Sequence, residues 1–189
     1  DFLHRAVFLQ DADDLLALSK SLLPQGPRFL IAHSMGGGIS MLALSKAPDL
    51  FTGAMLSSPM LGVHTGAFPR PIARMAASFG DLLFPDKYAP GKGAWAPDPT
   101  LSAETALASH DPQRCKLLEY WYAAHPEVRV DGATYGWVRS AFELTDRVAE
   151  AALLARITTP LLIGAAQEEH FVDPEAAARA VKLLPNATL

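Results

Sequence analysis

The sequence contains one cysteine, Cys115, among 189 residues. A single thiol excludes an internal disulfide and any metal site built from several thiolates, and it fits a reducing compartment. Because free cysteines are among the most buried residue types, we expect Cys115 to be an ordinary packed thiol.

Long apolar runs and basic clusters are also missing. No stretch of about 18 apolar residues occurs, so no segment predicts a transmembrane helix. Sixteen Lys and Arg against twenty Asp and Glu give a formal net charge of -4, and this balance gives no electrostatic reason to expect nucleic acid as a partner. We expect a folded protein of the cytoplasm, with a peripheral position at the inner membrane as the alternative.

Helix-like and strand-like segments alternate in the first third of the chain. Apolar residues at helical spacing predict a helix over residues 11–23, and a short apolar run predicts a buried parallel strand over 29–32. A further helix is expected over 39–46 and a strand over 53–57. Strand, helix and strand with short loops predict a βαβ unit and therefore an α/β fold.

The character of the sequence changes between residues 60 and 155. Prolines and glycines are frequent up to residue 99, and helix-like segments then follow around residues 117–123 and 137–144. We interpret residues 60–155 as a mostly helical cap inserted into a core formed by residues 1–59 and 156–189.

The α/β pattern resumes after the predicted cap. A strand is expected over residues 159–164 and a helix over 174–184, with a proline in its first turn. Residues 186–189 resemble the beginning of another strand.

The candidate nucleophile is Ser34, in the stretch Ala32-His33-Ser34-Met35-Gly36. This stretch is a variant of the strand-turn-helix pattern G-x-S-x-G, with alanine in the first glycine position. A serine on such a turn is lifted clear of the sheet, and side chains two positions to either side would collide if they were large. The backbone N–H of Met35, at the start of the following helix, is expected to stabilise an oxyanion.

An activated serine needs a histidine as base and a carboxylate that orients it. In this type of fold the chain order is serine, acid, histidine, and the acid follows a late strand. Glu168, Glu169 and Asp173 all follow the strand that ends near residue 164. We favour Glu169 from its place in the loop, and the other two remain alternatives.

The base itself is expected outside this sequence. No histidine follows His170, and His170 is too close to its own acid to turn toward the serine, so we expect the catalytic histidine beyond residue 189. His33 is expected to pack or hydrogen-bond locally, and His64 is a weaker candidate for lining the pocket. The remaining histidines, for which solvated or capping roles are expected, are His4, His110 and His125.

A loop before residue 1 would supply the second oxyanion donor, so both ends of the fold are expected to be missing.

Four stretches together resemble one known family. They are residues 29–37, residues 57–61 with the sequence SSPML, residues 133–137 with ATYGW, and residues 168–173 with EEHFVD. In these stretches the chain resembles the bacterial lysophospholipase family, which is related to monoacylglycerol lipases and grouped with the so-called serine aminopeptidases (S33, Hydrolase_4) of the α/β-hydrolase fold.

The resemblance implies a serine esterase that works through an acyl-enzyme on Ser34. Residues 60–155 would form a lid over an acyl-chain pocket, and the substrate would be a lysophospholipid or a monoacylglycerol. No metal or organic cofactor is implied, no nucleic acid is expected, and transient contact with a membrane surface fits the substrate. Two alternatives stay open: an aminopeptidase or iminopeptidase on the same fold, and a catalytically incomplete hydrolase that only binds an apolar ligand.

Overall fold

The structure is a computed structural model that describes residues 8–66, 68–97 and 109–189. Two compact units divide these residues. The sheet unit contains the described residues up to Arg70 and those from Ser140 onward, and the helical unit contains those between Pro71 and Arg139. The division into two units does not show which residues cover a substrate, so the cap expected over residues 60–155 stays a prediction.

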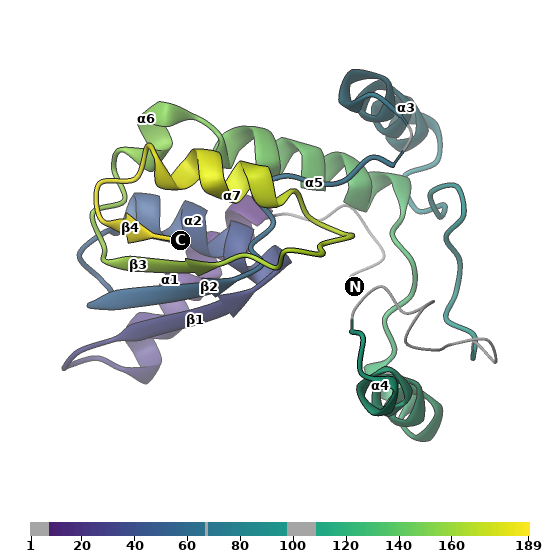
Figure 1. The fold of residues 1–189 in the computed structure, drawn as a ribbon, viewed down its shortest axis with the longest axis horizontal. Helices are drawn as coiled ribbons and strands as arrows, with labels where there is room; N and C mark the ends of the chain where they lie inside the picture. Colours follow the sequence, from purple (N-terminus) through teal and green to yellow (C-terminus); the bar gives the residue numbers. More distant parts are fainter. Residues whose placement is uncertain (1–7, 67, 98–108) are drawn as a thin grey trace. The chain divides into compact units, whose positions relative to one another are not determined.

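The helices and strands alternate as an α/β chain with a helical middle (Figure 1). In chain order they are α1 (Phe8–Leu22), β1 (Phe29–His33), α2 (Met35–Lys46), β2 (Gly53–Ser57), α3 (Arg70–Leu83), α4 (Pro112–Ala124), the 3-10 turn η1 (Pro126–Val128), α5 (Tyr135–Val148), α6 (Ala151–Leu154), β3 (Leu161–Gly164), α7 (Pro174–Val181) and β4 (Ala187–Thr188).

The four strands form one parallel sheet in the order β1-β2-β3-β4. Ile31 lies beside Met55, and Met55 lies beside Leu162. Helices connect the strands, as parallel pairing requires. The parallel sheet flanked by helices that the sequence predicts is therefore confirmed.

One face of this sheet packs against helices. Leu56, Leu161 and Ile163 are buried on that face, and α2, which is buried along most of its length, packs on β1 while α1 packs on α2 (Figure 1). The buried residues of α1, Phe8, Ala12 and Leu16, recur at helical spacing. The hydrophobic core of the sheet unit therefore lies between the sheet and α2.

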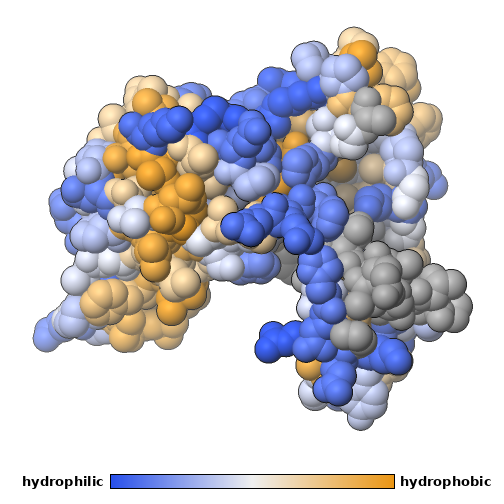
Figure 2. Space-filling model, in the orientation of Figure 1, coloured by the Kyte–Doolittle hydropathy of each residue, from blue (hydrophilic) through white to orange (hydrophobic). Residues whose placement is uncertain are grey.

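The other face of the sheet is apolar and open in the described residues. It carries Phe29, Ile31, Met55 and Leu162, of which Ile31 is 78% exposed. In Figure 2 hydrophobic residues gather over the strands, at the left of the view. Parallel sheets are ordinarily covered on both faces, which explains why these strands read as continuous apolar runs in the sequence.

In the helical unit, α3 packs on the first residues of α5. Gly80 lies directly against the ring of Tyr135, so there is no room for a side chain at this position. Nearby, Arg139 Nη1 lies 2.9 Å from Oδ2 of the buried Asp81. The other side of α3 is an exposed apolar stripe at helical spacing, formed by Ile72, Met75, Phe79 and Leu82.

Two further properties concern the described residues alone. None of their helices combines the length and the apolar character that crossing a membrane would need. Nor do they contain a group of three His, Cys, Asp or Glu side chains arranged to hold a metal ion.

Cys115 is buried, as expected for a packed thiol, and its thiol contacts the carbonyl oxygen of Ser109 at 3.0 Å.

Candidate active site

Ser34 stands on a strained turn between β1 and α2. Its φ is 49° and its ψ is -119°, a conformation that costs a non-glycine residue about 1–3 kcal/mol and that tends to occur at functional sites. Ser34 occupies the N-cap position of α2, yet its side chain makes no capping hydrogen bond. The hydroxyl, which would ordinarily cap the helix, therefore remains available for another role.

Small residues surround this turn for a visible steric reason. A Cβ atom placed on Gly36 would lie 3.9 Å from Cβ of Ala32, so positions 32 and 36 face each other as the motif predicts. A Cβ atom on Gly37 would lie 2.6 Å from Cβ and 2.9 Å from Cα of Pro59. The first of these contacts is ordinary, whereas the second is impossible without movement of the backbone.

This difference predicts opposite effects for two adjacent alanine substitutions. Gly37→Ala should lower the free energy of unfolding by about 1–3 kcal/mol, because overpacking against Pro59 forces the backbone apart. Gly36→Ala, the matched control, should be neutral or stabilising by up to about 1 kcal/mol, since alanine favours a helix more than glycine does. Urea denaturation of both variants measures the effects, and equal stabilities would contradict the steric account.

Met35 is the first residue of α2. The first N–H groups of a helix have no partner within the helix, and the helix dipole places partial positive charge there. The N–H of Met35 follows directly on the candidate nucleophile, which is the position that an oxyanion donor requires. Its assignment to this role stays a prediction.

The carboxylate of Glu169 organises the loop that follows β3. Its Oε1 atom accepts hydrogen bonds from the N–H groups of His170, Phe171 and Val172, at 3.0, 2.9 and 3.4 Å. Partial burial raises the pKa of Glu169, but hydrogen bonds from Phe171, Val172, the Ser58 side chain and His170 together bring the pKa below its usual value. The carboxylate is therefore held ionised and in a fixed orientation.

The two alternative acids have different surroundings. Asp173 is the N-cap of α7, where it accepts the N–H of Glu175 at 2.9 Å, and its Oδ2 lies 2.8 Å from Nη2 of Arg179. Glu168 is exposed. Asp173 thus has a local structural role, which favours Glu169 as the acid without testing it.

The sheet brings the Ser34 turn and the Glu169 loop to one edge. Ser34 follows β1 and Glu169 follows β3, and the carboxyl ends of parallel strands share an edge, where ligands bind in open α/β sheets. Between them runs the end of β2: the N–H of Ser34 donates to Ser57 O at 3.0 Å, and the N–H of Ser58 donates to Gly164 O at 2.7 Å. The positive φ of Ser58, 40°, was not expected from the sequence, in which Ser58 stood out only as part of the SSPML stretch.

No histidine of the described residues is hydrogen-bonded to the hydroxyl of Ser34. The Nδ1 atom of His33 lies 3.0 Å from Ser57 O, which is the local role expected of it. His64 does line a pocket, although not one that contains Ser34. His170 is exposed, and its N–H donates to Glu169.

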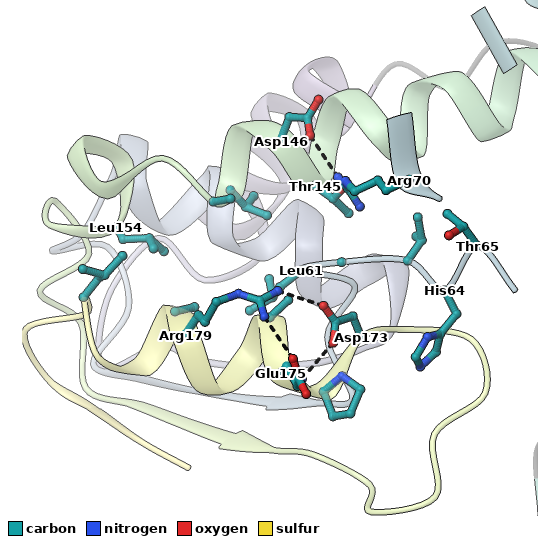
Figure 3. A pocket seen from close by; sticks show the side chains of 18 of the residues that line it. Leu61, His64, Thr65, Arg70, Thr145, Asp146, Leu154, Asp173, Glu175 and Arg179 are labelled. Atoms are coloured by element: carbon teal, nitrogen blue, oxygen red, sulfur yellow. Dashed lines mark hydrogen bonds and ion pairs between the residues drawn. The ribbon is translucent and has the colours of Figure 1, made fainter. Parts of the chain in front are cut away.

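A separate pocket of about 710 Å³ lies between α5, α7 and residues 61–66 (Figure 3). Neither Ser34 nor Glu169 lines it. Two of its arginines pair with carboxylates: Arg70 lies 2.9 Å from Asp146, and Arg179 pairs with Asp173. Because the candidate nucleophile is absent from its walls, we do not assign the chemistry to this pocket.

Comparison with known proteins gives one family and one fold. Residues 4–188 match the family described as serine aminopeptidase, S33. The chain is 34% identical over 175 residues to lysophospholipase L2 of Escherichia coli K12, covering 90% of this chain and 50% of that protein. It is 28% identical over 172 residues to a monoacylglycerol lipase of Mycolicibacterium smegmatis, covering 91% of this chain and 54% of that protein.

Among solved structures, the monoacylglycerol lipase of Paleococcus ferrophilus matches with a TM-score of 0.69 at 20% identity, covering 97% of this chain and 63% of that one. At this identity the likeness establishes the α/β-hydrolase fold alone. The chain spans about half the length of the curated relatives it matches.

Proposed function

This chain belongs to the serine aminopeptidase (S33) family, and we propose that the protein is a carboxylic ester hydrolase that acts on lipid esters through Ser34. One observation carries the proposal: a serine in a strained conformation at a helix N-cap, whose hydroxyl does not cap that helix. Strain of this kind persists only where the surrounding structure enforces it, and it is common where a nucleophile must be exposed.

The proposed reaction has two halves. Ser34 Oγ attacks the ester carbonyl, its proton passes to a histidine base, and the oxyanion is stabilised by the N–H of Met35. The tetrahedral intermediate then collapses, the alcohol leaves with the proton from the histidine, and an acyl-enzyme remains. Water, deprotonated by the same histidine, releases the fatty acid and restores Ser34.

Glu169 is proposed to orient the histidine and to stabilise its protonated form. The lowered pKa of Glu169 supports this role, because the acid must stay ionised while the imidazole gains a proton. The position of the histidine beyond residue 189 stays a prediction from the chain order of these residues.

A lipid substrate is supported by the names of the relatives and by the apolar stripe of α3. The relatives are named as a lysophospholipase and a monoacylglycerol lipase. Ile72, Met75, Phe79 and Leu82 offer an apolar surface of the kind that an acyl chain contacts. We propose that residues 60–155 act as a lid, and that the stripe also makes transient contact with membrane surfaces.

A substrate panel tests the proposal on the protein expressed from its complete coding sequence. Hydrolysis of monooleoylglycerol and of a lysophospholipid is expected, with no cleavage of aminoacyl anilides. Preferential cleavage of the anilides would instead support an aminopeptidase. A protein that turns over none of these substrates, yet binds fatty acyl ligands equally well after Ser34→Ala, would support the non-catalytic alternative.

The lid proposal predicts a selective defect when the α3 stripe is made polar. Phe79→Ser should lower kcat/KM for long-chain esters by roughly 10-fold, the order expected for losing the burial of one large apolar side chain. Hydrolysis of an acetate ester should change little, because an acetyl group has almost no apolar surface to bury. Leu18→Ser on α1, where the side chain is 55% exposed, is the matched control, and an equal loss for both ester lengths would contradict the role of the stripe.

A further inference from the structure

Residues 62–64, here called the bridge segment, pair with the loop that carries the candidate acid. Val63 and Val172 lie opposite each other in an antiparallel β-bridge. The N–H of Asp173 donates to Gly62 O at 3.0 Å. Two parts of the sheet unit that are more than a hundred positions apart along the chain are therefore fixed to each other through their backbones.

The loop residues that pair with the bridge segment also hold the carboxylate of Glu169. Phe171 donates its N–H to Glu169 Oε1 at 2.9 Å, and its carbonyl oxygen accepts the N–H of His64 at 3.2 Å. Val172 donates to the same carboxylate oxygen at 3.4 Å, and its side chain is buried. A shift of the bridge segment would therefore move the peptide groups that orient Glu169.

The residues just before the bridge segment contact the Ser34 turn. The N–H of Met60 donates to Ser34 O at 2.8 Å, and Ser57 O accepts the N–H of Ser34 at 3.0 Å. Only Leu61, which is buried, separates Met60 from the bridge segment. This short stretch of chain therefore sets where the acid loop lies relative to the candidate nucleophile.

At Gly62 there is no room for a side chain. A Cβ atom at this position would lie 2.9 Å from Cβ of Asp173 and 2.9 Å from Cβ of Ala176. These are the first carbons of their side chains, so they move only with their own backbone. Because Gly62 is buried, a larger residue there would push the bridge segment away from the end of the acid loop and the start of α7.

We propose that Gly62 is a positioning residue, whose lack of a side chain lets the bridge segment hold the acid loop in register with the Ser34 turn. This inference rests on the proposed function, in which Ser34 is the nucleophile and Glu169 orients the base. It adds to that function a residue that acts through the backbone of the loop and not through contact with the reacting atoms.

Gly62→Ala tests the steric requirement in the intact protein. It should lower kcat for monooleoylglycerol by roughly 10- to 100-fold, the loss expected when a reacting group is misplaced by about 1 Å, with KM changed less than about twofold. Gly53→Ala is the matched control, because a Cβ atom there would meet its nearest neighbours at 3.6 Å, an ordinary contact. Its kcat should stay within about twofold of the wild type. Wild-type kcat for Gly62→Ala would overturn the proposal.

A double-mutant cycle separates positioning from a general loss of structure. In a Glu169→Ala background, Gly62→Ala should cause no further loss of kcat, because the displaced loop no longer carries a carboxylate that orients the base. An equal loss in both backgrounds would overturn the proposal. The proposed function is tested separately, because it fails if Ser34→Ala remains active whatever Gly62 does.

A second pair of variants tests the proposal if Gly62→Ala does not fold. Asp173→Pro and Asp173→Ala both lose the carboxylate that caps α7, but only the proline variant also loses the N–H that donates to Gly62 O. The φ of Asp173, -86°, is close to the value that proline requires. The kcat of Asp173→Pro should be roughly 10-fold below that of Asp173→Ala, because the released loop misplaces Glu169. Equal kcat values for the two variants would overturn the proposal.

Discussion

Ser34→Ala is expected to reduce kcat for ester hydrolysis by roughly 10,000- to 1,000,000-fold, the range found when a serine nucleophile is removed. Without Oγ no acyl-enzyme can form, so only binding and oxyanion stabilisation remain. The fold should survive, because Ser34 makes no side-chain cap to lose. Steady-state turnover of a lysophospholipid, with melting temperature measured in parallel, checks both parts of this expectation.

A second serine supplies the matched control. Ser45 lies in α2, where its buried hydroxyl donates to Leu42 O at 2.8 Å. Ser45→Ala should cost about 0.5–1.5 kcal/mol of stability, the usual value of a hydrogen bond, while kcat stays unchanged. Turnover by Ser34→Ala within tenfold of the wild type would rule out Ser34 as the nucleophile.

The second large effect is expected at Glu169. Glu169→Gln keeps the shape of the side chain but removes its charge, and kcat should fall roughly 1,000- to 10,000-fold, as it does when the acid of a catalytic triad is neutralised. The pKa of Glu169 is lowered in the folded protein, so the contribution of its ionised form is lost only as the pH falls below the ordinary carboxyl pKa. The fall of kcat/KM at acid pH should therefore follow protonation of the catalytic histidine rather than protonation of Glu169.

The two neighbouring carboxylates are the controls for this assignment. Glu168→Gln should leave kcat within about twofold of the wild type, as expected for an exposed loop charge. Asp173→Ala should destabilise the protein by about 1 kcal/mol, because α7 loses its N-cap. A loss of kcat at Asp173 or Glu168 larger than the loss at Glu169 would show that the acid has been misassigned.

Much of the fold could be predicted from local patterns. The strand over residues 53–57 has its predicted bounds, because a short apolar run is closed on both sides by turn-forming residues. The helix predicted from residue 39 instead begins at Met35. Glycine is a poor helix former, which hid the first turn, and only contacts far along the chain, with Pro59 and Met60, explain why glycines are needed there.

The helix α3 was missed, although its signal was present. Prolines and glycines are frequent over residues 60–99, and no helix is predicted there from the sequence, yet Ile72, Met75, Phe79 and Leu82 recur at helical spacing. Pro71 lies in the first turn of α3, where proline is compatible with a helix. A proline therefore argues against a helix only where it lies beyond the first turn.

Some features of the candidate site depend on local sequence, and others depend on contacts between residues far apart in the chain. Ser34 could be proposed as the nucleophile from the sequence because the strand, the turn and the helix are contiguous. The sequence favours Glu169 among three carboxylates only from its place in the loop, because the hydrogen bonds that distinguish Glu169 from Asp173 appear only in the folded loop. The hydrogen bond from the N–H of Ser58 to Gly164 O joins residues more than a hundred positions apart, and no local pattern encodes it.

Covalent labelling of the intact protein with a fluorophosphonate, mapped by mass spectrometry of its peptides, tests the central claim most directly. The account predicts a single phosphonylated residue, Ser34, with labelling abolished in Ser34→Ala and slowed in Glu169→Gln. Labelling at another serine, or undiminished labelling of Ser34→Ala, would contradict the assignment of Ser34 as the nucleophile.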